Sequence, residues 1–155
     1  MTKTNAVRML EAAGISFSTF EYEVDENDLS GETVAKKINV ETDAVFKTLV
    51  ARNEANEIFV FCIPVTTELN LKKAAKASGS KSIALIHVKE LLPLTGYIRG
   101  GCSPVGMKKN FPTFIDETAQ LFETIFVSAG VRGMQMRLSP IDLLKVTEAE
   151  FADLT

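Results

Sequence analysis

Residues 46–64 read FKTLVARNEANEIFVFCIP, and this stretch gives the clearest indication of the fold class. Two runs rich in apolar, β-branched and aromatic side chains, 48–52 and 58–64, flank a mostly polar segment at 53–57. Two such runs joined by a short polar connection predict an antiparallel β-hairpin. The centre of the chain is therefore expected to be a sheet.

Similar short runs continue along the chain, and few long helices separate them. Further strands are expected at 15–23, 83–87, 113–116, 124–128 and 134–138. Helices are expected at 4–13, 30–37 and 71–77 and from Ser139-Pro140 onward, with one helical turn at 88–92 closed by Pro93. Because regular crossover helices do not alternate with the strands, the pattern favours an α+β fold with a mixed, mostly antiparallel sheet.

Length and composition fit one globular domain that spans residues 1–155. Of these residues 46% are hydrophobic and 24% are charged, which argues against disorder. No apolar run approaches the ~20 residues of a membrane helix, and the N-terminus lacks a signal-peptide core, so we expect a cytoplasmic protein that does not bind membranes. Cys62 and Cys102 do not have the spacing of metal ligands, and we expect neither a metal nor a cofactor.

The net charge of −3 argues against a protein that coats DNA or RNA, because neutralised phosphates supply most of that affinity. A local basic rim around a pocket remains compatible with this charge. The candidate phosphate-binding cations are Lys72, Lys73, Lys108, Lys109 and Arg132. For the first two, a solvated helix face is the simpler interpretation.

A glycine-rich segment at 100–109, GGCSPVGMKK, has three interpretations. Its first two glycines would let a ligand approach main-chain N–H groups, and Pro104 would stiffen the segment, so a loop of backbone donors is one. A structural turn is about equally well supported. The third, a reactive Cys102, lacks a base, because the only histidine, His87, lies in an apolar run. A buried, inert thiol is the better prediction.

Lys47 is the second candidate site residue, because it stands within the apolar run VFKTLV at 45–50. A buried ammonium is costly unless it meets an anion or a backbone acceptor. Lys47 is therefore either a surface lysine with its stem along apolar residues or a site residue that holds a polar ligand.

Four segments in order resemble a known family. They are FKTL at 46–49, LKKAAK at 71–76, TGYIRGGCSPVG at 95–106, and Asp116 followed by IFVSAG at 125–130. Their ordered combination resembles the YbaK/EbsC family of bacterial Cys-tRNA(Pro) deacylases, which are related to the editing domain inserted in bacterial prolyl-tRNA synthetases. The resemblance extends from the first helix to Phe151.

This resemblance implies a fold in which a mixed sheet curls into a partial barrel with helices packed around it. It also implies that Lys47 corresponds to the family's essential lysine, that Ser128 closes the pocket and that Tyr22 lies near it. The family's GxxxP loop, which approaches the terminal adenosine, corresponds to Gly100, Gly101, Cys102, Ser103 and Pro104. Some members carry an acidic residue where this chain has Gln135, which leaves the role of that side chain open.

The implied activity is trans-editing, in which cysteine is removed from the 3′ end of mischarged Cys-tRNA(Pro) and also from Cys-tRNA(Cys). In the family the substrate's own thiol is thought to attack its carbonyl, while the protein positions and polarises the ester. Prolyl-tRNA synthetase is the implied partner. Two alternatives stay open: an Ala-tRNA(Pro) deacylase of the same fold, and a non-catalytic module that binds a nucleotide or the tRNA end.

Overall fold

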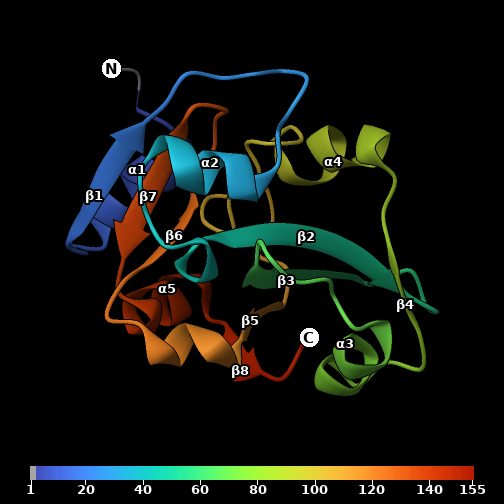
Figure 1. Cartoon of the computed structure of the whole chain (residues 1–155). Coiled ribbons are helices and arrows are strands. Elements are labelled where there is room, and N and C mark those ends of the chain that lie inside the picture. Colours follow the sequence, from blue (N-terminus) through green and yellow to red (C-terminus); the bar gives the residue numbers. More distant parts are fainter. Residues whose placement is uncertain (1–2) are drawn as a thin grey trace.

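The computed structural model describes residues 3–155, which form two β-sheets with helices packed around them (Figure 1). The strands are β1 (Phe17–Glu21), β2 (Phe46–Asn53), β3 (Ile58–Pro64), β4 (Ile83–Leu85), β5 (Thr113–Asp116), β6 (Ile125–Ser128), β7 (Met134–Leu138) and β8 (Glu150–Ala152). The α-helices are α1 (Asn5–Ala12), α2 (Gly31–Lys37), α3 (Leu71–Ser78), α4 (Val88–Thr95) and α5 (Pro140–Thr147). The predicted α+β class is confirmed.

The predicted hairpin is the centre of the larger sheet, whose strand order is β4-β2-β3-β5-β8. β2 and β3 pair antiparallel from Phe46 opposite Pro64 to Arg52 opposite Ile58, so β2 begins two residues earlier than predicted. β4 adds antiparallel to one end of β2, while β5 and β8 add in parallel beyond β3. The sheet is therefore mixed, as expected.

The smaller sheet has the order β1-β7-β6 and is antiparallel throughout. It meets the larger sheet at one parallel bridge, between Val45 just before β2 and Phe126 in β6. The two sheets are joined at this bridge and do not close into a barrel. This junction brings the end of β6 beside the start of β2, where the candidate site lies.

Side chains along the hairpin alternate between the two faces of the sheet, so the hairpin divides the core into two layers. Phe46, Val50 and Cys62 belong to a cluster that also contains residues of α1 and of the smaller sheet. Ala51 and Phe61, which point to the opposite face, pack with Ala74 and Ala75 of α3 in a second cluster. Both faces of β2 and β3 are therefore covered, which explains why β3 is almost continuously apolar.

The prediction of one turn at 88–92 closed by Pro93 was wrong. α4 continues through Pro93 and ends at Thr95. Gly96, which has a positive φ of 86°, is its C-cap. Proline at this position removes a single N–H bond near the helix end, and the hydroxyl of Thr95 donates to the Leu91 carbonyl at 2.7 Å. β8 and a 3₁₀ helix at Glu117–Leu121 were not predicted. No helix within residues 3–155 has the length and apolarity to cross a membrane.

Candidate functional site

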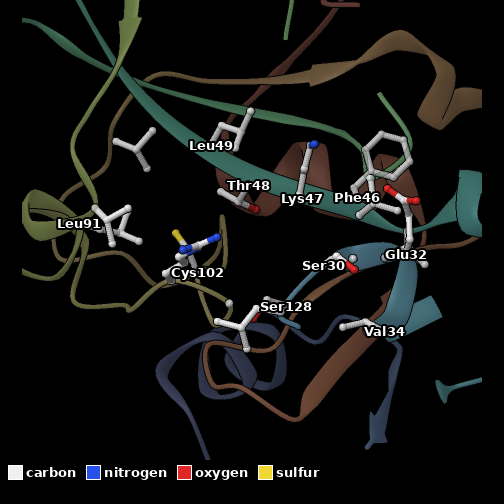
Figure 2. A pocket seen from close by; sticks show the side chains of 18 of the residues that line it. Ser30, Glu32, Val34, Phe46, Lys47, Thr48, Leu49, Leu91, Cys102 and Ser128 are labelled. Carbon is white, nitrogen blue, oxygen red and sulfur yellow. The ribbon is translucent and has the colours of Figure 1, made fainter. Parts of the chain in front are cut away.

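A cavity of about 450 Å³ lies among β2, α2, α4 and the segment that follows α4 (Figure 2). Most of its lining is apolar, with polar side chains and glycines at a few points. Of the predicted site residues the structure places five in its lining: Tyr22, Lys47, Gly100, Cys102 and Ser128. These come from four separate parts of the chain, and the fold brings them to one place.

The α2 wall is held close to the larger sheet by Gly31. A Cβ atom at this position would lie 2.1 Å from Cγ1 of Val65, so only glycine permits this approach. The hydroxyl of Ser30 caps the helix by accepting from the Thr33 N–H at 3.3 Å. Ser30, Glu32 and Val34 then face the cavity.

The α4 wall is tied to β2 through Glu90. Its carboxylate accepts from the backbone N–H of His87 at 2.9 Å and from the guanidinium of Arg52 at 2.9 Å. These two contacts, the His87 N–H first, lower the pKa of Glu90. The start of α4 is thereby fixed on the sheet, and His87, Val88 and Leu91 line the cavity.

Lys47 and Thr48 are neighbours on β2 with opposite orientations. Figure 2 shows the ammonium of Lys47 on one side of the β2 ribbon, and Thr48 on the other side with Cys102. Lys47 is half-buried, and within residues 3–155 its ammonium has no hydrogen-bond or ion-pair partner. A free cation at a mostly apolar cavity is suited to hold an anion or a polarised oxygen.

Ser128 and Gln135 lie opposite each other on β6 and β7 and are both buried. The Ser128 hydroxyl accepts from the Gly130 N–H at 3.2 Å. The side-chain oxygen of Gln135 is buried without a hydrogen-bond partner among the described residues, although this side chain reaches the cavity. An unpaired buried amide oxygen costs free energy, and such groups concentrate at functional sites.

The segment at 100–106 is a braced turn rather than a row of free donors. The Gly101 N–H donates to the Ile98 carbonyl at 2.9 Å, and the Ser103 hydroxyl accepts from the Val105 N–H at 3.2 Å. Tyr97 donates its hydroxyl hydrogen to the Val105 carbonyl at 2.6 Å. Only Gly100 and Cys102 reach the cavity lining. Gly101, Ser103 and Pro104 lie outside it, although a substrate role had been expected for them.

Cys102 is buried, and burial raises the pKa of its thiol to about 12. A thiol with that pKa stays protonated near neutral pH and is a poor nucleophile. Cys62, buried in β3 opposite Thr48, has its pKa raised to about 12 for the same reason. The cavity therefore contains a thiol that contributes shape rather than reactivity, in agreement with the inert cysteine predicted from the sequence.

The five predicted phosphate-binding cations are not brought together. Arg132 lies next to the cavity, where it donates to the Arg99 carbonyl at 2.8 Å. Lys108 and Lys109 are exposed, and the stem of Lys108 lies against Gly96 at the end of α4. Lys72 and Lys73 are on α3, which packs on the opposite face of the larger sheet, and Lys73 forms an ion pair with Asp153 at 3.0 Å.

Several lining residues had not been singled out from the sequence as site residues. Glu32, Thr48 and Arg99 have ordinary local contexts, and only the packing of distant elements brings them to the cavity. His87 had been expected at a strand end or in the core, and it lies at the start of α4 instead. The capping pair formed by His87 and Glu90 was the available signal, since an acid three residues after a helix start is a common cap.

Comparison with known proteins agrees with this geometry. Residues 26–146 match the family described as the aminoacyl-tRNA editing domain. The chain is 48% identical, over 99% of its length and 93% of the relative's, to EbsC of Enterococcus faecalis, provisionally named a Cys-tRNA(Pro)/Cys-tRNA(Cys) deacylase. It is 29% identical to part of the proline--tRNA ligase of Brachyspira hyodysenteriae, over 54% of this chain and 14% of the ligase.

Solved structures support the same assignment. A crystal structure provisionally assigned as a trans-editing enzyme for prolyl tRNA synthetase superposes with a TM-score of 0.85 at 25% identity. The superposition covers 100% of this chain and 99% of that one. With the sequence match over most of the chain, the fold and the cavity lead to one conclusion: this protein belongs to the aminoacyl-tRNA editing domain family.

Proposed function

We propose that the protein is a trans-editing deacylase that removes cysteine from Cys-tRNA(Pro), and also from Cys-tRNA(Cys). The observation that carries the proposal is Lys47 in the lining of the cavity, with an ammonium that has no partner among residues 3–155. A relative that is 48% identical to this chain supports the choice of substrate, because it is provisionally named as a deacylase of these two aminoacyl-tRNAs. The cavity of about 450 Å³ has the size of a small-ligand site, which suits the end of a tRNA rather than its body.

The proposed reaction uses the nucleophile that the substrate brings. The cysteinyl thiolate attacks its own ester carbonyl, a carbon–sulfur bond forms, and the bond from the carbonyl carbon to the ribose oxygen breaks. The products are a cyclic thiolactone and the free ribose hydroxyl, which takes up the proton that left the thiol. The inertness of Cys102 fits this chemistry, because the attacking sulfur belongs to the substrate.

In this proposal the protein positions and polarises the ester. The ammonium of Lys47 holds the terminal nucleotide or its ester oxygens, and Gly100 allows the ribose to approach the backbone. Tyr22 and Ser128 complete the wall of the pocket. Loss of one donor that stabilises developing negative charge typically lowers the rate on the order of 10²–10³-fold.

The decisive test compares three charged tRNAs. Cysteinyl-tRNA(Pro) carries the thiol, 2-aminobutyryl-tRNA(Pro) has nearly the same shape with a methyl group in its place, and alanyl-tRNA(Pro) is smaller. We expect rapid loss of cysteine and no measurable cleavage of the other two. Cleavage of the 2-aminobutyryl ester would show hydrolysis by water. Cleavage of the alanyl ester alone would identify an Ala-tRNA(Pro) deacylase, and inactivity on every charged tRNA would indicate a binding module.

We further propose that prolyl-tRNA synthetase supplies the selection of the tRNA body. The chain has a net charge of −3, and its five candidate phosphate-binding cations are divided between α3, residues 108–109 and the neighbourhood of Gly100. Such a surface gives weak, salt-sensitive binding to a polyanion. Addition of the synthetase is therefore expected to lower the KM for Cys-tRNA(Pro) more than it changes kcat.

A further inference from the structure

The edge of β2 opens into the cavity. Six consecutive residues, from Val45 to Val50, line this space. Successive side chains in a strand point to opposite faces of the sheet. Because residues from both faces of β2 line this cavity, the cavity meets β2 at the edge of the strand. At this edge a ligand can reach the main chain as well as the side chains.

Hydrogen bonds on either side of β2 show which backbone groups point to that edge. The Val45 carbonyl accepts from the Val65 N–H at 2.9 Å, and the Asn53 N–H donates to the Glu57 carbonyl at 3.0 Å. Odd-numbered residues therefore direct their N–H and C=O groups toward β3. The Val50 carbonyl accepts from the Ile86 N–H at 3.1 Å on the other side, so even-numbered residues face the opposite edge.

This opposite edge is covered at both ends and open between them. At one end the bridge between Val45 and Phe126 covers it. At the other end Ile86 and the β4 pairing, which begins at Ala51, cover it. Thr48 lies in the gap, and within residues 3–155 its one strand pairing is with Cys62 of β3, on the other side of β2. The N–H and C=O of Thr48 are the two groups with which a single residue of an extended chain could pair.

We propose that Thr48 recognises the aminoacyl group of the substrate through its main chain, as a one-residue β-bridge. An aminoacyl ester carries a donor, the α-ammonium, and an acceptor, the ester carbonyl, in the arrangement of one strand residue. The Thr48 carbonyl accepts from the α-ammonium, and the Thr48 N–H donates to the ester carbonyl oxygen. This inference rests on the proposed function, because it assigns part of the same substrate to the same cavity.

The arrangement has a consequence for specificity and for rate. The bridge requires an α-amino group, so it distinguishes aminoacyl esters from other acyl esters whatever the side chain. A hydrogen bond from the Thr48 N–H to the carbonyl oxygen also strengthens as that oxygen gains negative charge. Substrate side chain and main chain are thus recognised by different parts of the cavity.

Amide hydrogen exchange on the whole protein tests the bridge directly. The probe is 3′-deoxy-3′-(cysteinylamino)adenosine, in which an amide replaces the labile ester, and a 3-mercaptopropionyl analogue without the α-amino group serves as the comparison. In the free protein we expect fast exchange at Thr48 and slow exchange at Leu49, whose N–H faces β3. Saturation with the probe should slow exchange at Thr48 at least tenfold, and the comparison compound should bind more weakly.

Two variants extend the test to turnover. Thr48→Val and Thr48→Pro both lose the hydroxyl, and only the proline variant loses the N–H, which is not part of the ladder with β3. We expect kcat/KM of the folded proline variant to be lower than that of the valine variant, on the order of 10²-fold. Equal values, or unprotected Thr48 with bound probe, would overturn the inference. Protection at Thr48 without deacylation of any tRNA would instead refute the proposed function and keep the bridge.

Discussion

A methyl group added at Gly31 tests how α2 forms the wall of the cavity. In Gly31→Ala the new Cβ would lie 2.1 Å from Cγ1 and 2.6 Å from Cβ of Val65. Val65 cannot easily retreat, because its N–H is bonded to the Val45 carbonyl at 2.9 Å. Restoring an ordinary carbon–carbon contact of about 3.5 Å therefore requires α2 to move outward by about 1.4 Å.

The expected cost follows from this overlap. Overpacking of a well-packed contact costs about 1–3 kcal/mol, and the better helix propensity of alanine returns up to ~1 kcal/mol. For a chain of this length, each kcal/mol corresponds to roughly 2–4 °C in Tm. Ser30, Glu32 and Val34 move with the helix, so the cavity widens and kcat/KM falls as well.

Thermal unfolding followed by circular dichroism, together with single-turnover deacylation, measures both effects. Gly79→Ala is the matched control, because its Cβ would meet nothing within 4 Å while its φ of +68° makes alanine strained. It should lower Tm and leave kcat/KM unchanged, since neither Gly79 nor any residue of α3 lines the cavity. A Gly31→Ala protein with wild-type Tm and wild-type kcat/KM would refute the packing argument.

Three further predictions concern other parts of the structure. The pKa of Glu90 is lowered from its ordinary 4.5, so its contribution to stability is complete above that value and is lost as the pH falls through the lower folded-state pKa. Glu90→Gln should therefore lower the urea midpoint near pH 7, and this difference should shrink as the pH falls below 4.5; a pH-independent difference would contradict this sign. Iodoacetamide at about pH 8 should leave Cys102 unmodified in the folded protein and alkylate it after unfolding, because burial raises its pKa to about 12; rapid alkylation of the folded protein would refute its inertness. Lys108→Ala should weaken tRNA binding more than Lys73→Ala, because Lys73 is paired with Asp153 and Lys108 is exposed; the reverse order would place the tRNA on α3.

Local patterns in the sequence were sufficient to predict most elements. The hairpin, the strands at 113–116 and 134–138 and the start of a helix at residue 30 each depend on neighbouring residues, and each is present. The α4 helix was underestimated because a proline inside a helix usually ends it, and here the lost bond falls near the end of the helix. β8 has only three residues, and its pairing with β5 is set by contacts that no local pattern contains.

Site prediction depended on a different kind of information. Lys47 stood out because a cation within an apolar run is costly, and the structure places it at the cavity with no partner among residues 3–155. Glycine content alone could not tell which part of the 100–106 segment faces a ligand, since the Gly101 N–H is used within the turn. The open edge at Thr48 depends on where β4 and β6 stop, which only the assembled sheets determine.

Lys47 is the residue on which the proposed activity depends most, and one measurement tests its role. Single-turnover deacylation of Cys-tRNA(Pro) would be compared between the wild type and Lys47→Met, which keeps the apolar stem and removes the charge. The expected result is activity in the wild type and a loss on the order of 10²–10³-fold in the folded variant. A folded Lys47→Met protein that releases cysteine at the wild-type rate would contradict it.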